Sequence, residues 1–273
     1  MKTLIASFLF GSIVLLAQPE RLAFDVASVK VNAARTGIRG HSYPGDRFEA
    51  VNVPLRDLLM VAYGEAGVAL PEFLLTGGPT WIDTDRFDVS ATVGRGRPNT
   101  VAQKQLMLRT LLAERFKLVV HTESKEQPIY ALTVASKSGV LGPQLHHVDV
   151  DCEPELASQP GRRDGCIFYA LPSGLLMLRG QTMSGLANVL TRLLDKVVRD
   201  RTGLAGGFDA DGRFNPEGLP GMYQLKPDDP DRPAVDVPSL FVALREQLGL
   251  ALQSTRGPVD VVVIDRVEHP TEN

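Results

Sequence analysis

Two segments of the chain share the same order of hydrophobic and polar positions. The first is "LAERFKL" (residues 112–118) and the second is "LREQLGL" (residues 244–250). Ahead of each segment, apolar residues recur at intervals of three and four, which is the spacing of a helix with one buried face. A polar turn and a β-rich run follow each segment, from Pro128 and from Pro258. Each segment therefore predicts a helix that leads into a strand.

A second pair of helical patterns lies upstream of the first. "NVPLRDLLMVAYG" (residues 52–64) and "QTMSGLANVLTRLL" (residues 181–194) also space their apolar residues by three and four. Pro54 suits the first turn of a helix, where its missing N–H costs nothing. Thr182 or Ser184 can accept a hydrogen bond from a free N–H at the start of the later helix. Both segments are expected to be short helices entered from extended chain.

These similarities predict an α+β fold of two tandem repeats of a small module, in which two helices pack on short, mainly antiparallel sheets. We assign the first module to residues 19–137 and the second to residues 177–273. Residues 138–176 are expected to form a connector. A region rich in proline and aspartate, residues 215–238, is expected to be a long loop within the second module.

The repeat makes a prediction about equivalent positions. Leu112 is expected to correspond to Leu244, and Leu118 to Leu250. In each copy, the strand that follows the last helix is expected to form a hairpin with the run that begins at the proline.

The first residues are typical of a secretory signal peptide. Lys2 precedes an uncharged, mostly apolar run, residues 4–16, which is too short to span a bilayer as a helix. Residues 1–18 are therefore expected to be removed on export, which leaves a periplasmic or extracellular protein. No stable membrane span is expected after that cleavage.

Export affects the interpretation of the two cysteines, Cys152 and Cys166. In an oxidising compartment they are expected to form a disulfide that staples the connector. The competing interpretation is a zinc site, because His146 and His147 lie close to the first cysteine in "LHHVDVDC". Adjacent histidines point in opposite directions on an extended strand, which favours the disulfide.

The segment "GGPTWIDTDRFDV" contains the only tryptophan, Trp81, and three carboxylates, Asp83, Asp85 and Asp88. Its imperfect alternation predicts a hairpin whose turn lies near the first two aspartates, because aspartate is a common turn residue. Arg86 is expected to pair with a neighbouring carboxylate. The segment lacks the glycine that a calcium loop needs at its turn.

Charge and motifs exclude several classes of function. The net charge is -3 and no long Lys/Arg run occurs, so no nucleic-acid partner is expected. The nucleophile elbow, the zinc-protease helix motif and the phosphate-binding loop are all absent, and no cofactor is expected. A hydrolase or metal-dependent enzyme remains as the alternative function, with Asp83, Asp85 and Asp88 or with His146 and His147 at its centre.

The leading hypothesis is an exported, non-enzymatic protein that binds an envelope protein or a peptide. Its interaction surface is expected around Trp81, Asp83, Asp85 and Arg86, because tryptophan is enriched in binding hot spots. The competing interpretation is that Trp81 fills the core of the first module.

Longer segments carry a family resemblance. They are "FDVASVKVN", "NVPLRDLLMVAYG", "GGPTWIDTDRFDV", "LLAERFKLVVHTE", "VVRDRTGLAGGFD" and "VDVVVIDRVEHPTEN". Together they resemble a large exported family of uncharacterised proteins that is expanded in soil acidobacteria. The repeated unit, with its "LxxLL" helix, "VVxDxTG" strand and final "LxxxLGL" helix, also resembles the short N-terminal domain of secretins and TonB-dependent transducers. That resemblance implies a module that docks protein partners in the cell envelope, although the loop at residues 215–238 departs from it.

Overall fold

The computed structural model describes residues 22–33, 38–65, 68–97, 99–149, 167–170, 173–220 and 236–270. Several expectations fall on other parts of the chain. The expected signal peptide, both members of the expected Cys152–Cys166 disulfide, and residues 221–235 of the expected loop lie outside the described residues.

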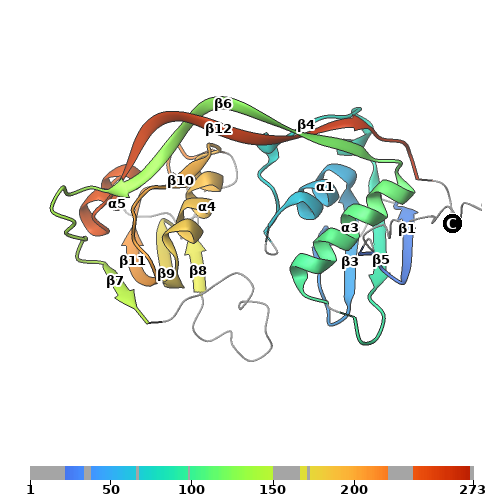
Figure 1. Ribbon diagram of the computed structural model, residues 1–273, viewed down its shortest axis with the longest axis horizontal. Helices are drawn as coiled ribbons and strands as arrows, with labels where there is room; N and C mark the ends of the chain where they lie inside the picture. The colour runs from blue at the N-terminus through green and yellow to red at the C-terminus, as the bar shows by residue number, and fades with distance from the viewer. Residues whose placement is uncertain are drawn as a thin grey trace, which may run out of the picture.

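Two lobes lie on one side of a long two-stranded ribbon (Figure 1). The ribbon consists of β6 (Val119–Val134) and β12 (Leu250–Arg266), which run antiparallel. At the first lobe, β4 (Leu75–Gly77) lies parallel to β12, and at the second lobe β10 (Val198–Asp200) lies parallel to β6. The resulting sheet has the order β10-β6-β12-β4 and therefore belongs to both lobes.

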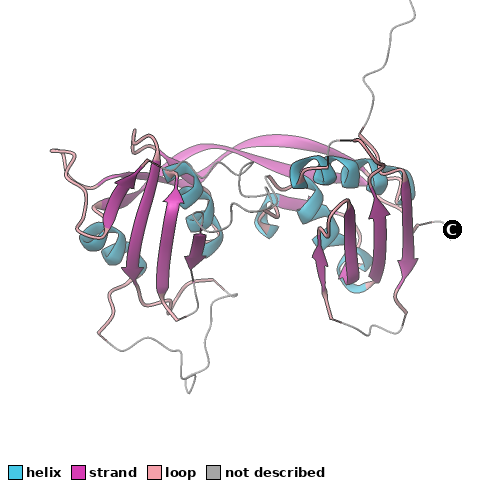
Figure 2. Cartoon of the chain, turned by 90° about the horizontal axis from the view of Figure 1, so that it is seen from below, coloured by secondary structure: helices cyan, strands magenta, loops and turns pink. Residues whose placement is uncertain are grey.

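The first lobe contains a second sheet, which helices cover on one face (Figure 2). Its strands are β1 (Val26–Val31), β2 (Gly40–Ser42), β3 (Arg47–Pro54) and β5 (Arg86–Thr92). They are all antiparallel and have the order β1-β5-β3-β2. The helical segments of this lobe are α1 (Leu55–Tyr63), η1 (Glu72–Leu74), α2 (Trp81–Thr84) and α3 (Val101–Arg115).

The second lobe has a similar composition of elements. Its strands are β7 (Leu145–Val148), β8 (Ile167–Ala170), β9 (Leu175–Gln181) and β11 (Gly207–Arg213), in the antiparallel order β7-β11-β9-β8. Its helices are α4 (Met183–Leu193) and α5 (Leu240–Gln247). The segment expected as a connector, residues 138–176, thus contains β7 and β8. The mixed α+β class is confirmed, and none of the described helices is long and apolar enough to span a membrane.

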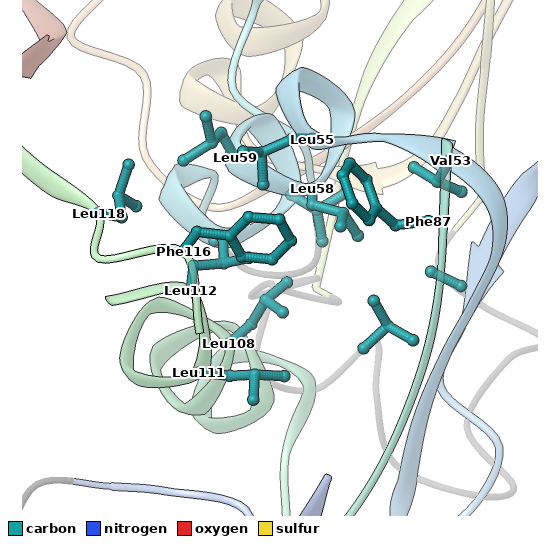
Figure 3. Packing of buried hydrophobic residues seen from close by; sticks show 14 of the residues in the cluster. Val53, Leu55, Leu58, Leu59, Phe87, Leu108, Leu111, Leu112, Phe116 and Leu118 are labelled. Atoms are coloured by element: carbon teal, nitrogen blue, oxygen red, sulfur yellow. The ribbon is translucent and has the colours of Figure 1, made fainter. Parts of the chain in front are cut away.

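The core of the first lobe forms where the apolar faces of its helices meet the sheet. Leu58 of α1 and Leu112 of α3 are fully buried, and Phe87 of β5 lies against them (Figure 3). The ring of Phe87 makes a T-shaped contact with Phe116, with centroids 5.1 Å apart. Burial of each such side chain stabilises the fold by roughly 1.5–3 kcal/mol. Ile264 of β12 joins the same cluster, so the ribbon is part of this core.

The core of the second lobe is built in the same manner. Leu190 of α4 and Leu244 of α5 are buried against Phe208 of β11. The ribbon contributes Leu132 from β6 and Leu250 from β12. Of the two residues expected to cap α4, Thr182 does so, because its side chain accepts a hydrogen bond from the backbone N–H of Gly185.

The predicted hairpins are wrong, because β6 continues through Pro128 and β12 continues through Pro258. Tyr130 donates its backbone N–H to Val197 O at 2.9 Å, away from β12. Alternate residues of a strand point the same way, so the nitrogen of Pro128 also faces away from β12. Pro258 pairs with Glu126, which lies two residues before Pro128 on β6. Pairs two residues apart in an antiparallel ladder are of the same type, so the nitrogen of Pro258 also faces away from the partner strand. Neither proline therefore removes a hydrogen bond between the two strands.

The predicted hairpin around Asp83 and Asp85 is also wrong, because α2 occupies this place. The backbone N–H of Asp85 donates to Trp81 O at 2.9 Å and closes one helical turn. Gly77 and Gly78 have φ of +83° and +84° and turn the chain from β4 into α2. Glycine adopts this conformation more readily than any other residue.

The junction between α5 and β12 gives a test of the packing. Gly249 has φ of +69°, and a Cβ there would lie 2.3 Å from Gly142 N and 2.8 Å from Leu141 C. Gly249→Ala is expected to lower the free energy of unfolding by about 2–4 kcal/mol, from backbone strain plus displacement of this loop. Gly203→Ala is the control, because Gly203 has φ of +70° but no atom within 4 Å of the added Cβ. Its expected loss is about 1–2 kcal/mol. Equal losses in chemical denaturation would contradict the close contact.

Candidate functional site

Trp81 is half-buried at the start of α2. It packs against the core of the first lobe, where its ring meets Phe87 in a T-shaped contact with centroids 6.4 Å apart. The indole is also stacked on the imidazole of His269, with ring centroids 3.9 Å apart and an interplanar angle of 25°. Trp81 is therefore anchored in the core and also forms part of the surface, where the imidazole of His269 covers one face of its indole.

His269 is held over Trp81 by the segment that follows β12. Val267 packs against the first-lobe core, and the backbone N–H of Glu268 donates to Phe116 O at 2.7 Å. The next residue, His269, places Nε2 at 3.0 Å from Asp85 Oδ2. The side chain of His269 is 58% exposed and that of Asp85 is 34% exposed. No local sequence pattern singles out His269, because its partners lie nearly 200 positions earlier in the chain.

The remaining charged residues of the predicted surface have different surroundings. Asp83 forms an ion pair with Arg56 of α1, whose Nη2 lies 3.3 Å from Asp83 Oδ2. The side chain of Arg56 is only 17% exposed. Arg86 was expected to pair with a neighbouring carboxylate. Its Nη1 atom is buried, and no described residue accepts a hydrogen bond from that atom.

The side chain of Asp88 forms hydrogen bonds within the sheet of the first lobe. It accepts a hydrogen bond from Asn32 Nδ2 at 3.0 Å and another from the backbone N–H of Asn52 at 2.8 Å. Asn52 has φ of +53° and lies where the register between β3 and β5 shifts. Asp88 therefore holds a β-bulge in place. Within the described ranges, no group of three or more His, Cys, Asp or Glu side chains is arranged to hold a metal ion.

The two adjacent histidines lie on the edge strand β7 and are both exposed. His147 pairs in register with Phe208, and their rings make a T-shaped contact with centroids 5.3 Å apart. His146 is opposite Asp209. Because successive side chains of a strand alternate between faces, the two imidazoles lie on opposite sides of the sheet.

A separate cluster of charged, solvent-exposed side chains lies on the ribbon. His121 Nδ1 is 2.8 Å from Asp265 Oδ1, and its Nε2 is 3.2 Å from Glu123 Oε1. The hydrogen bond to Asp265, followed by the one to Glu123, raises the pKa of His121 above 6.5. The neighbouring ammonium of Lys125 and then His121 lower the pKa of Glu123. All these side chains are well solvated, so this cluster is a surface ion-pair network.

Comparison with known proteins identifies the family. Residues 56–267 match the family described as Protein of unknown function (DUF3738), and the chain belongs to this family. The match begins within α1 and includes both strands of the ribbon. It confirms the expected membership of an uncharacterised family. Searches of curated proteins and of solved structures found no match.

The ribbon cluster predicts a pH dependence. Because the folded pKa of His121 is raised above its unfolded value, its stabilising contribution is complete below the unfolded pKa. That contribution is lost as the pH rises through the folded pKa. In an NMR titration, the midpoint of His121 is expected above 6.5 and is expected to fall in Asp265→Asn. Asp260→Asn, on the same strand, is the control and should leave it unchanged. A titration midpoint of His121 that is unchanged in Asp265→Asn would show that the His121–Asp265 pair does not form in solution.

Proposed function

We propose that the chain is an exported, non-enzymatic binding protein whose first lobe carries the interaction surface. The observation that supports this most is the half-buried indole of Trp81, which stacks on the same His269 imidazole that contacts the carboxylate of Asp85. An aromatic ring that is anchored in the core and half-buried at the surface suits an interaction hot spot. Export rests on the pattern of residues 1–18, and on the resemblance to exported acidobacterial proteins.

The proposed Trp81 surface comprises Trp81, Asp83, Asp85 and Arg86. Its base is α2, which packs on the first-lobe core through the buried Ile82. Because α2 is held by this packing, less conformational entropy is lost when a partner binds to the surface. The resemblance of the repeated unit to the short N-terminal domain of secretins and TonB-dependent transducers supports a protein or peptide of the cell envelope as the partner.

We further propose that the two lobes are copies of one module. The two separate sheets have corresponding orders, β1-β5-β3-β2 and β7-β11-β9-β8. Each copy also contains a β-bulge whose backbone N–H is bound by an aspartate side chain of the neighbouring strand. Asn52, with φ of +53°, donates its N–H to Asp88 at 2.8 Å, and Gly180, with φ of +63°, donates its N–H to Asp209 at 2.7 Å.

The ribbon supports the same proposal through its register. β10 begins its pairing with β6 at Tyr130, and β4 begins its pairing with β12 at Val262. Tyr130 and Val262 are as far apart in the sequence as Leu118 and Leu250, the two residues that were expected to be equivalent. The same repeat spacing therefore relates both pairs. Under this proposal each module lends its last strand to the other, as in a swapped dimer that has become one chain.

The alternative, a hydrolase or metal-dependent enzyme, has less support. Asp83, Asp85 and Asp88 have Arg56, His269 and backbone or amide donors as their respective partners. A pair of catalytic carboxylates would instead face one reacting group.

The proposed function is tested by partner capture from an envelope extract, with the mature chain immobilised and its contacts cross-linked. Trp81→Ala is expected to weaken binding of the captured partner about 30-fold, which corresponds to a hot-spot contribution of about 2 kcal/mol. Phe241→Ala removes an exposed aromatic ring from the second lobe and is the control that should retain the partner. Capture that is equal for wild type and Trp81→Ala would contradict the proposal.

Metal analysis of the same purified chain addresses the alternative function. Stoichiometric zinc or calcium in the mature protein would favour the enzyme and count against a purely binding role.

A further inference from the structure

We propose that Trp81 and Asp85 bind the guanidinium group of an arginine side chain from a partner peptide, and that His269 occupies this position when the partner is absent. This inference rests on the proposed function and names the chemistry of its ligand. The chain itself supplies a planar nitrogen-containing ring, the imidazole of His269, to the site between Trp81 and Asp85.

The contacts of His269 define what the place recognises. Its imidazole lies nearly parallel to the indole of Trp81, with centroids 3.9 Å apart, and its Nε2 lies 3.0 Å from Asp85 Oδ2. The place therefore offers an aromatic face and a carboxylate to the same flat group. A guanidinium is planar, always charged, stacks on aromatic rings and can donate two hydrogen bonds to one carboxylate. It can make both contacts of His269 and one additional hydrogen bond.

Asp85 is the carboxylate that would bind the charge of the guanidinium group. Asp83 is already paired with Arg56, whose side chain is largely buried. Apart from His269, the side chain of Asp85 accepts a bond from the hydroxyl of the adjacent Thr84 at 3.3 Å. Departure of the imidazole would therefore uncover both an indole face and an anionic oxygen. A neutral aromatic group would leave that oxygen without an ionic partner, and the ammonium of lysine has no flat surface to stack.

His269 can leave without disturbing the core. The backbone hydrogen bond from Glu268 to Phe116 O and the packing of Val267 fix the chain just before it. More than half of the His269 side chain is already exposed. Rotation of this one residue therefore opens the place, while β12 stays paired. His269 acts as an internal competitor, which lowers the apparent affinity for any ligand by the fraction of open molecules.

Trp81 is the only tryptophan of the chain, so its fluorescence reports directly on this place. The probes are N-acetyl-arginine amide and N-acetyl-citrulline amide, which have nearly the same shape but differ in charge. On full-length His269→Ala, the arginine probe is expected to change Trp81 fluorescence saturably, and the citrulline probe is not. On wild type, the same arginine titration is expected to need about tenfold more probe, because His269 competes.

Two further variants in the His269→Ala background assign the anchor. Asp85→Asn is expected to lose the response to the arginine probe, whereas Asp260→Asn, an exposed carboxylate of the ribbon, should keep it. Circular dichroism and the unfolding midpoint verify that each variant is folded. If His269→Ala does not fold, the wild-type chain still provides a test, because the arginine probe should shift the imidazole NMR signals of His269 and the citrulline probe should not.

Three results would overturn the inference: no saturable response to arginine, equal responses to arginine and citrulline, or equal affinities of wild type and His269→Ala. These results are distinguishable from failure of the proposed function. If partner capture depends on Trp81 but the arginine probe does not bind, the surface is an interaction site for another chemical group. If the probe binds but capture is indifferent to Trp81, the guanidinium site exists and the captured partner uses another surface.

Discussion

The antiparallel ladder between β6 and β12 passes through the cores of both lobes. At one end Leu250 pairs with Val134 beside the second core, and at the other end Ile264 pairs with Val120 beside the first. Each lobe completes its hydrophobic core with side chains from this ladder, and each adds one short parallel strand to its edge. Loss of the ladder would expose apolar surface in both lobes at once, so their stabilities are coupled through it.

The part of the ribbon between the lobes needs its own protection, because a bare two-stranded ribbon has two free edges. Pro128 and Pro258 lie here and present no N–H to an added strand. On the apolar face, Ile129 and Val259 form a small cluster with Val197 of the second lobe, and residues of η1 from the first lobe pack against it. The ribbon is therefore stiffened where it would otherwise be exposed on both sides.

Local patterns predicted the helices well and the long-range pairing poorly. The three- and four-residue spacing located α1 and α4, and the hydroxyls near the start of α4 narrowed its cap to Thr182 or Ser184. The same reasoning took Pro128 and Pro258 as starts of new strands, because proline usually interrupts a ladder; only the outward direction of their nitrogens allows one strand to continue. Of the predicted surface, Trp81 and Asp85 are brought together by the turn of α2, whereas His269 arrives through tertiary packing that a single sequence does not encode locally.

The strand exchange in the ribbon has a consequence for the order of folding. The first lobe contains Val262 and Ile264 in its core, yet these residues are synthesised only after the whole second lobe. The N-terminal half therefore cannot reach its final packing while it emerges; it must wait for a strand more than a hundred residues downstream. Contacts so distant in sequence slow folding, because a large loop has to close before they form. A polypeptide with this architecture stays incompletely folded until its last strand is available.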